Sequence, residues 1–387
     1  MPSSISSSES RLVAPELALR AGFVRLTASD RPGVAQPVPE REVPPRPWRP
    51  ILLGAAVLAV LLIAGWEFYW RSFGVSPSYH NSNGEWAQQR RRIDDGEGGK
   101  TVLLGDSRTL FDVQLPVWEQ VAGERPIQLA IEGTSALPML EDLAADANFT
   151  GRLVVGVAPQ VFFSGFSFRG GVVPYYHKEG PSRRIGNWLS MHLVEPYFAF
   201  YDEDFKLNKV VKRQNWPGRP GLPPYTDVRK LAMSDADRNT HVWDKVATDE
   251  SYRELARRIW TQVFGHPMPG METREKASKL VDEQITRAAA AVAKLRARGV
   301  PVVFVRPPSS GEYYVYEQRV FPRAETWDLL LKRTGAAGIH FDDYPQLQGY
   351  YLPEWSHIAA SDANRFTAAL VPIVQLEFKA FHQAPAN

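Results

Sequence analysis

One uncharged apolar run near the N-terminus constrains this chain more than any other feature. Residues 51–66 read ILLGAAVLAVLLIAGW and carry no charged side chain. Aromatic residues flank the run on both sides, as they do at membrane interfaces: Trp48, Phe68, Tyr69 and Trp70. With them the run reaches about 20 residues, the length of a helix that crosses a bilayer. Because its hydrophobicity is all-round instead of one-sided, we predict a transmembrane helix over residues 50–70 and not a buried core helix.

The charges around this run predict its orientation. Four arginines precede it closely and a single one follows it closely: Arg31, Arg41, Arg46, Arg49 and then Arg71. The positive-inside rule therefore places the N-terminus in the cytoplasm. A tail of about 50 residues is too long for a cleaved signal peptide, and no A-x-A site follows, so the run is interpreted as a signal anchor. Residues 71–387 are then expected outside the cytoplasm of a bacterium, periplasmic or extracellular, held at the inner (cytoplasmic) membrane by a single span in the lipid bilayer.

Composition predicts the regions on either side of the span. Residues 1–49 are expected to form a disordered cytoplasmic tail, since residues 1–50 hold nine of the 31 prolines, begin Ser-rich and show no apolar period. Residues 71–100 are a predicted linker. The chain has no Cys, which excludes thiol nucleophiles and thiolate metal sites. Its formal charge is only +2, so no nucleic acid is expected as a partner.

Five short apolar runs, each ending in turn residues, follow in the rest of the chain. These predicted strands are residues 101–107, 126–133, 152–159, 300–308 and 338–345. Helical stretches separate them, and runs of Val, Leu and Ile buried on both faces are typical of a parallel sheet in an α/β protein. We therefore predict an α/β domain over residues 101–387, with a doubly wound, mostly parallel five-stranded sheet.

Three helices are predicted between and after these strands. Residues 271–298 place their apolar side chains on one face, and the helix is expected to stop at Gly299. A second helix is expected over residues 109–121. A third is expected after Ser361 as its N-cap, with a kink at Pro372.

The long interval between the third and fourth strands predicts an insertion. Residues 160–299 lie there, 140 in all, whereas a crossover needs only about a dozen residues or slightly more. The extra segment, about residues 165–265, carries three Trp by residue 247 and the Pro-rich run NWPGRPGLPPY at 215–225. We interpret it as a cap over the edge of the sheet, with an irregular structural excursion as an equal alternative.

Two short motifs carry candidate chemistry. In the first, GDS at 105–107, Ser107 follows the first strand and begins a predicted helix, and open α/β sheets bind ligands outside the carboxyl ends of their strands. Alone, this Ser is also an ordinary N-cap. In the second, PEWSH at 353–357, a carboxylate precedes a His by three residues, so that one turn brings both to the same side. Ser107 is then a candidate nucleophile, His357 its general base and Glu354 the group that orients the imidazole.

Together these motifs resemble the SGNH (GDSL-type) hydrolase superfamily. Its first block, GDS with the Ser as nucleophile, matches 105–107, and its last block, D-x-x-H, matches Glu354 to His357 with Glu in place of Asp. The resemblance implies an oxyanion Gly after the second strand, at Gly133. Glu for Asp adds one methylene, which the Ser-His-Glu triads show to be tolerated.

The third block of that superfamily, usually G-x-N-D, is missing. In its place stands APQVFF at 158–163, which resembles the Ser-Pro-Gln-Trp-Phe segment of the D-alanine transfer proteins of teichoic acid synthesis. Those proteins also carry one N-terminal span and an extracytoplasmic SGNH-like domain. The resemblance leaves the backbone near Ser107, Gly133 and Gln160 as the candidate oxyanion donors, because loss of the Asn removes one donor.

Two arginines near the predicted site have two interpretations. Arg108 and Arg306 lie at the carboxyl ends of two predicted strands and are candidates to clamp a carboxylate or phosphate of an anionic polymer. Ion pairs with Asp106 or Asp343 are the alternative. His340 falls within the fifth strand and is expected to be a packed core residue. No metal-ligand spacing occurs, and neither a metal nor a cofactor is predicted.

These observations predict a membrane-anchored SGNH-like acyl-ester enzyme. It would move acetyl or similar groups to or from a cell-envelope glycan or exopolysaccharide through an acyl-enzyme on Ser107. By the same resemblance, a membrane-bound O-acyltransferase could supply the acyl group. Two alternatives stay open: a non-catalytic polysaccharide-binding or assembly protein on the same fold, and a plain carbohydrate esterase.

Overall fold

The computed structural model of the protein describes residues 46–214 and 229–383. The chain divides into two compact units, residues 1–63 and residues 64–387. Nearly all of the predicted cytoplasmic tail lies outside the described residues, and so does the Pro-rich run at 215–225.

The apolar run forms helix α2, Trp48–Ser72, two residues longer at each end than predicted. Within the described part of the chain it is the one helix long and apolar enough to cross a membrane. Its large apolar side chains from Ile51 to Ile63 are exposed, so no protein core accounts for their hydrophobicity. Length and composition therefore agree with the predicted span.

The last turns of α2 belong to the second unit and are held there by the inserted segment. The Glu67 carboxylate accepts hydrogen bonds from the backbone amides of Ala199 at 3.1 Å and Phe200 at 3.0 Å. Trp70, the one buried residue of the helix, stacks on Phe205 with ring centroids 4.4 Å apart. The insertion is thus fastened to the chain where the apolar helix ends.

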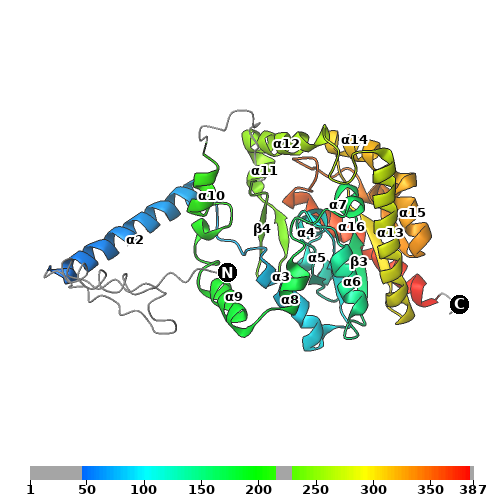
Figure 1. The fold of residues 1–387 in the computed structure, drawn as a ribbon, viewed down its shortest axis with the longest axis horizontal. Coiled ribbons are helices and arrows are strands. Elements are labelled where there is room, and N and C mark those ends of the chain that lie inside the picture. Colours follow the sequence, from blue (N-terminus) through cyan, green and yellow to red (C-terminus); the bar gives the residue numbers. More distant parts are fainter. Residues whose placement is uncertain (1–45, 215–228, 384–387) are drawn as a thin grey trace, which may run out of the picture. The chain divides into compact units, whose positions relative to one another are not determined.

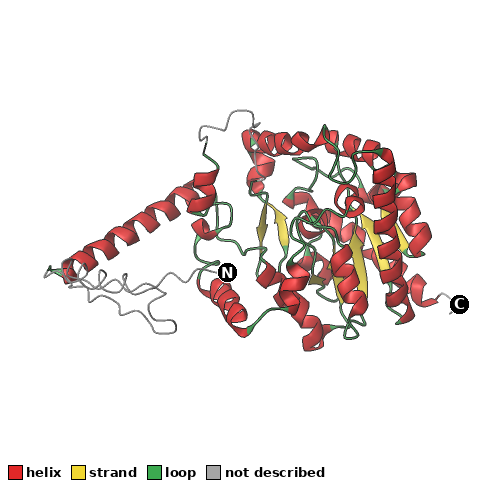
Figure 2. Cartoon of the chain, in the orientation of Figure 1, coloured by secondary structure: helices red, strands yellow, loops and turns green. Residues whose placement is uncertain are grey.

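The second unit is built on a five-stranded sheet in which all strands are parallel (Figure 2). Along the sheet the strands are β2 (Ile127–Gln128), β1 (Thr101–Leu104), β3 (Arg152–Gly156), β6 (Val302–Arg306) and β7 (Ala337–His340). The five predicted strands are therefore confirmed, each shorter than its apolar run. The turn residues at the end of each run lie beyond the carboxyl end of the strand, where a site would be expected.

Both faces of this sheet are buried. Along β1, Val102 and Leu104 pack into one apolar cluster, whereas Leu103 packs into another, as the alternation of side chains along a strand requires. Helices line both clusters, and Figure 1 labels each of them. On the first face these are α6 (Leu137–Ala145), α13 (Arg274–Ala297) and α15 (Trp327–Thr334), and on the second α5 (Leu115–Ala122) and α16 (Ala360–Gln383).

The prediction of a single helix over residues 109–121 is wrong, because the structure has two helices there. Helix α4, Ser107–Asp112, ends before Gln114, whose backbone is extended, and α5 begins at Leu115. The amide of Gln114 donates to Thr367 Oγ1 at 2.9 Å instead of to the preceding turn. Pro116 lies in the first turn of α5, where its missing N–H costs nothing.

The last two predicted helices are present, with different ends. Helix α13 begins three residues later than predicted. Helix α16 begins at Ala360, so Ser361 is inside it and is not its N-cap. The helix also runs on through Pro372 to Gln383.

The inserted segment is mostly helical. Between β3 and α13 it comprises α7 (Pro159–Ser164), α8 (Val172–His177), α9 (Pro181–Leu193), α10 (Leu207–Lys212), the antiparallel pair β4 (Ala232–Ser234) and β5 (Thr240–Val242), α11 (Asp244–Thr248) and α12 (Glu250–Phe264). Helix α14, Gly311–Val320, follows β6 and contacts α12. The predicted linker at 71–100 contains a helix of its own, α3 (Asn83–Arg92), whose Trp86 is buried.

Candidate active site

Ser107 is presented by a tight junction between β1 and α4. The Asp106 carboxylate accepts a hydrogen bond from the amide of Arg108 at 3.1 Å and so caps the helix that Ser107 begins. A Cβ at Gly105 would lie 2.1 Å from Thr109 Oγ1, so only glycine lets the first turn of α4 pack this close to the strand. Asp106 and Arg108 are buried, whereas Ser107 between them is partly exposed. Of these three residues, Ser107 is therefore the one that solvent reaches.

The structure brings Ser107, His357 and Glu354 into one hydrogen-bonded chain. Ser107 Oγ lies 2.8 Å from His357 Nε2, and His357 Nδ1 lies 2.8 Å from Glu354 Oε1. Because an ionised carboxylate only accepts, Nδ1 carries the proton in the neutral imidazole, and Nε2 accepts from the hydroxyl. The three residues singled out from the two sequence motifs thus have the geometry of a nucleophile, a base and an orienting carboxylate.

An unusual backbone turn places Glu354 and His357 on the same side. Trp355 between them has a φ of +71°, in the left-handed region that bulky residues rarely adopt. The turn is held by Glu354 Oε1, which also accepts from the amide of His357 at 2.8 Å, and by Trp355 O, which accepts from the amide of Ser310 at 2.9 Å. Such strain persists only where the surroundings fix it, and it gathers at functional sites.

The inserted segment completes the surroundings of Glu354. Trp260, on α12, donates its indole N–H to Glu354 Oε2 at 2.6 Å, so both carboxylate oxygens are satisfied. Arg257 on the same helix donates to Pro353 O at 3.0 Å. Sequence reasoning missed Trp260, and the clustering of Trp in the insertion was the only signal for it.

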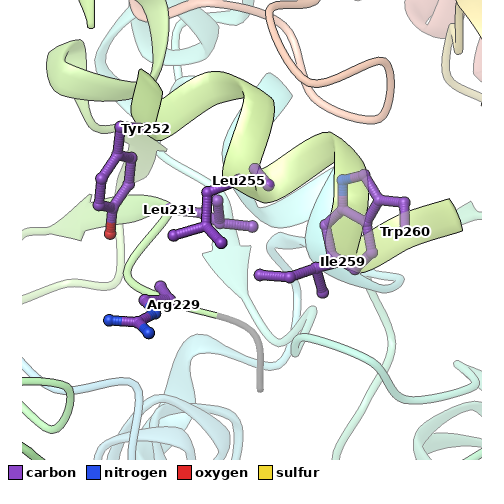
Figure 3. Close-up of a pocket in the computed structure, with 7 residues that line it drawn as sticks. Arg229, Leu231, Tyr252, Leu255, Ile259 and Trp260 are labelled. Atoms are coloured by element: carbon purple, nitrogen blue, oxygen red, sulfur yellow. The ribbon is translucent and has the colours of Figure 1, made fainter. Parts of the chain in front are cut away.

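Trp260 also lines an apolar pocket between α12 and the strand pair of the insertion. Figure 3 shows Ile259 and Trp260 beside Leu231 and Leu255, with Tyr252 and Arg229 at the other end. The pocket leaves essentially no space for a water-sized molecule. It is therefore part of the packing that holds Trp260 and not a substrate pocket.

Glu354 sets the protonation behaviour of His357. Burial alone would lower the pKa of the imidazole, but the adjacent Glu354 carboxylate raises it above the ordinary value for histidine. Burial would likewise raise the pKa of Glu354, and the His357 charge with the hydrogen bonds from His357 and Trp260 lowers it below its usual value. The pair therefore favours the charged forms, which stabilises the imidazolium that forms when Ser107 loses its proton.

Asp112 lies near the imidazole without joining the hydrogen-bonded chain. Its Oδ1 accepts from the amide of Ile358 at 2.8 Å, and burial raises its pKa to about 8. Glu354, and not Asp112, accepts the hydrogen bond from His357 Nδ1. The Phe111 ring packs against the His357 imidazole, with the two ring centroids 4.7 Å apart.

The predicted anion clamp, Arg108 and Arg306, is buried and shares a partner that sequence reasoning missed. Arg108 Nη2 lies 2.9 Å from Glu317 Oε1, and Arg306 Nη2 lies 2.7 Å from Glu317 Oε2. Burial would raise the pKa of Glu317, but the two guanidinium groups lower it. Of the two interpretations, ion pairing therefore agrees better with the structure, but the partner is Glu317 and not Asp106 or Asp343. This geometry favours a structural role for the two arginines over binding of an anionic substrate.

Replacing Glu317 with Gln should destabilise the protein strongly. The substitution removes the one carboxylate that pairs directly with both buried guanidinium groups, and breaking a buried ion pair from one side costs about 3–5 kcal/mol. The free energy of unfolding of the full chain in detergent, measured by urea denaturation, checks this. Glu119→Gln, in an exposed pair with Arg125, is the control and should change little; an equally small loss in Glu317→Gln would contradict the cluster's structural role.

Two of the remaining predicted residues, Gly133 and Gln160, lie beyond the carboxyl ends of their strands, and His340 is the last residue of β7. Gly133 follows β2 with a φ of +56°, and its carbonyl accepts from the amide of Phe168 at 2.9 Å. Gln160, in the first turn of α7, accepts from the Tyr313 hydroxyl through Oε1 at 2.5 Å. Their oxyanion role stays a prediction. His340 is buried, as expected of a packed core residue, and burial lowers its pKa to about 3.

No model of a known family matches the chain, and no curated protein matches it. The geometry of Ser107, His357 and Glu354 is therefore the observation that bears on function.

Proposed function

We propose that the protein is a membrane-anchored SGNH-like serine enzyme that moves acyl groups to or from an envelope glycan or exopolysaccharide. One observation carries this proposal: the chain of two 2.8 Å contacts from Ser107 through His357 to Glu354. A partly exposed serine, an imidazole and a buried carboxylate in that order are the groups that nucleophilic acyl transfer requires.

The proposed reaction has two halves. In the first, Ser107 Oγ attacks the acyl carbonyl carbon while its proton moves to His357 Nε2, and Glu354 stabilises the imidazolium. The tetrahedral intermediate then expels the alcohol oxygen, which takes the proton from Nε2, and the acyl group stays on Ser107. In the second half, a water molecule or a sugar hydroxyl attacks the acyl carbon while His357 Nε2 takes its proton. The second tetrahedral intermediate then expels Ser107 Oγ, which takes the proton back from Nε2 and restores the free enzyme.

The strand order supports the doubly wound, SGNH-like form of the fold. From the edge, the strands run second, first, third, fourth and fifth in order along the chain, so the order reverses next to β1. Ligands of open α/β sheets bind outside the carboxyl ends of the strands at such a reversal. Ser107, directly after β1, lies at this place.

Gln160 is the proposed substitute for the missing Asn. Because Tyr313 donates to its Oε1, the amide is oriented with Nε2 as its donor. Together with the backbone N–H of Gly133, this donor would stabilise the oxyanion. Such a substitute matters because loss of one oxyanion donor typically costs about 100- to 1000-fold in rate.

The apolar helix α2 favours transfer over scavenging hydrolysis. An anchor in the bilayer would hold Ser107 near a membrane-bound acyl donor, of which an O-acyltransferase is the proposed kind. The arginines that precede the helix favour a cytoplasmic N-terminus and a periplasmic or extracellular main domain.

Acyl turnover by the purified full chain in detergent tests this function. We expect the chain to release acetate from 4-nitrophenyl acetate, and added polysaccharide to accept part of the acetyl group, as ester on the glycan detected by mass spectrometry. Hydrolysis without any glycan ester would instead favour a plain esterase. Glycan binding with no turnover of either kind would contradict catalysis and favour the non-catalytic binding protein.

A further inference from the structure

Three buried side chains outside the proposed active site converge on one point. His80, Glu85 and Glu195 are each less than one-tenth exposed, and one donor atom from each lies within 4.8 Å of the other two. His80 precedes α3, Glu85 lies in its first turn, and Glu195 follows α9 in the insertion. The cluster therefore joins the segment after the apolar helix to the inserted segment.

The imidazole of His80 is held in the form that binds metals. Its Nε2 lies 2.8 Å from the backbone carbonyl of Tyr201, which can only accept, so Nε2 carries the proton. In the neutral ring the lone pair is then on Nδ1, which faces Glu195. A ring N–H donated to a backbone carbonyl is the usual outer contact of a metal-binding histidine.

Glu85 supplies the second, independent observation. It is 1% exposed, and neither of its carboxylate oxygens has a hydrogen-bond donor within the described residues. Its place three residues after the N-cap Ser82 would allow a capping box, in which the carboxylate reaches back to the cap amide. The Ser82 backbone N–H lies near enough to lower the pKa of Glu85, but neither carboxylate oxygen reaches hydrogen-bond geometry with it. The carboxylate therefore lies beside Glu195 without a full partner, and an unsatisfied buried carboxylate is costly.

The distance between His80 and Glu195 fits shared ligation better than a hydrogen bond. His80 Nδ1 lies 3.6 Å from Glu195 Oε1, too far for a hydrogen bond. Two ligands bound at about 2.0–2.1 Å in tetrahedral geometry lie about 3.3–3.4 Å apart. Glu195 is itself held, because Oε1 accepts from Ser190 Oγ at 2.6 Å and Oε2 accepts from the His80 amide at 2.9 Å.

The buried cation Arg238 acts on Glu85 but forms no hydrogen bond with the carboxylates of this cluster. Arg238 favours the ionised form of Glu85 electrostatically. Its guanidinium, however, donates to the side chain of Asn81 and to the carbonyls of Gln128 and Ala130. Two buried carboxylates therefore lie beside one another and beside His80 Nδ1, an arrangement that either a bound metal cation or a shared proton would satisfy.

We propose that His80 Nδ1 and the carboxylates of Glu85 and Glu195 bind a divalent transition-metal ion, with Zn²⁺ as the best match for one nitrogen and two oxygen ligands. Water would take the fourth position. Imidazole selects against Mg²⁺ and Ca²⁺, which prefer oxygen ligands alone. The ion would fasten the segment after the apolar helix, which carries His80 and Glu85, to the insertion, which carries Glu195.

Zinc binding by the full chain, purified in detergent without a His-tag, tests this site. We expect about one Zn²⁺ per chain by elemental mass spectrometry, and binding that competes with a chromophoric chelator. Glu85→Gln keeps the side-chain size and should weaken binding by more than the roughly 10- to 100-fold that loss of an outer partner costs. Ser190→Ala, which removes such an outer partner, should fall within that range.

The controls separate this site from surface binding and from the proposed ester chemistry. His177→Gln removes an exposed imidazole beside Asp142 and should leave zinc affinity unchanged. Zn²⁺ should raise the melting temperature of the wild type and not of Glu85→Gln. The competing explanation is a proton shared by the two carboxylates, since burial and Glu195 raise the pKa of Glu85 well above its usual value.

Three results would overturn the site: no chelator-competitive zinc, zinc affinity retained in Glu85→Gln, or a Glu85→Gln chain that is more stable than the wild type with no effect of Zn²⁺. The last is expected of a shared proton. Each readout is independent of turnover at Ser107, so failure of the metal site and failure of the proposed function are distinguishable.

Discussion

Replacing Ser107 with Ala is expected to abolish acyl turnover, with kcat falling by about a millionfold if the chemistry follows other serine triads. The substitution removes the oxygen that attacks the carbonyl carbon and leaves the 2.8 Å partner position of His357 Nε2 empty. His357→Ala should lose about as much. Because the two residues act as one unit, the double variant should lose no more than either single variant.

Steady-state release of 4-nitrophenol, with circular dichroism to confirm folding, measures this loss. Ser361→Ala, an exposed serine at the start of α16, is the matched control and should retain full activity. If Ser107→Ala keeps turnover within about tenfold of the wild type, the hydroxyl is not the nucleophile. Additive losses in the double variant would show that Ser107 and His357 act separately.

Replacing Glu354 with Gln is expected to lower kcat by about ten-thousandfold, because the amide no longer holds the imidazole with its proton on Nδ1. The same change should move the acidic limb of the pH–rate profile. Catalysis needs neutral His357, so kcat/KM falls as pH drops through the pKa of the imidazole. Glu354 raises that pKa. Without its charge, burial lowers the pKa, and the limb should shift to lower pH.

The pH dependence of kcat/KM between roughly pH 5 and pH 9 measures this shift. Glu354→Asp, which keeps the charge, should restore the position of the limb and part of the rate. Trp260→Phe removes one hydrogen bond to Glu354 Oε2 and should cost much less than loss of the carboxylate. An acidic limb that stays in place in Glu354→Gln would show that this carboxylate does not control His357.

Local sequence signals were sufficient for the strands and for the three residues of the proposed catalytic chain. Apolar runs with turn residues predicted all five strands, because both faces of this sheet are buried. The position of Ser107 after β1 and the three-residue spacing from Glu354 to His357 predicted that they would meet. Parallel strands put their carboxyl ends at one edge, so residues far apart in the sequence are brought together there.

Features fixed by distant contacts were not predictable in this way. The break between α4 and α5 is held by Thr367 and by Asn239, which accepts from the amide of Leu115 at 2.8 Å. Neither residue is near the break in sequence. The extended Gln114 is therefore a tertiary effect that overrides helix periodicity.

The buried polar partners were missed for the same reason. Glu317 neutralises Arg108 across 209 positions of the sequence, and Trp260 reaches Glu354 across 94. A single Glu or Trp in an amphipathic helix has no local mark that separates such a partner from a surface residue. His80, Glu85 and Glu195 likewise lack the short spacing by which metal sites are recognised in a sequence.

Intact-mass analysis of the full chain after reaction with a fluorophosphonate tests the central claim most directly, since such a probe phosphonylates only a serine activated by a neighbouring base. We predict one adduct per chain, located on Ser107 by peptide mapping, absent from Ser107→Ala and greatly slowed in His357→Ala. A chain that stays unlabelled while folded, or an adduct that persists in Ser107→Ala, would contradict the proposed nucleophile and with it the proposed function.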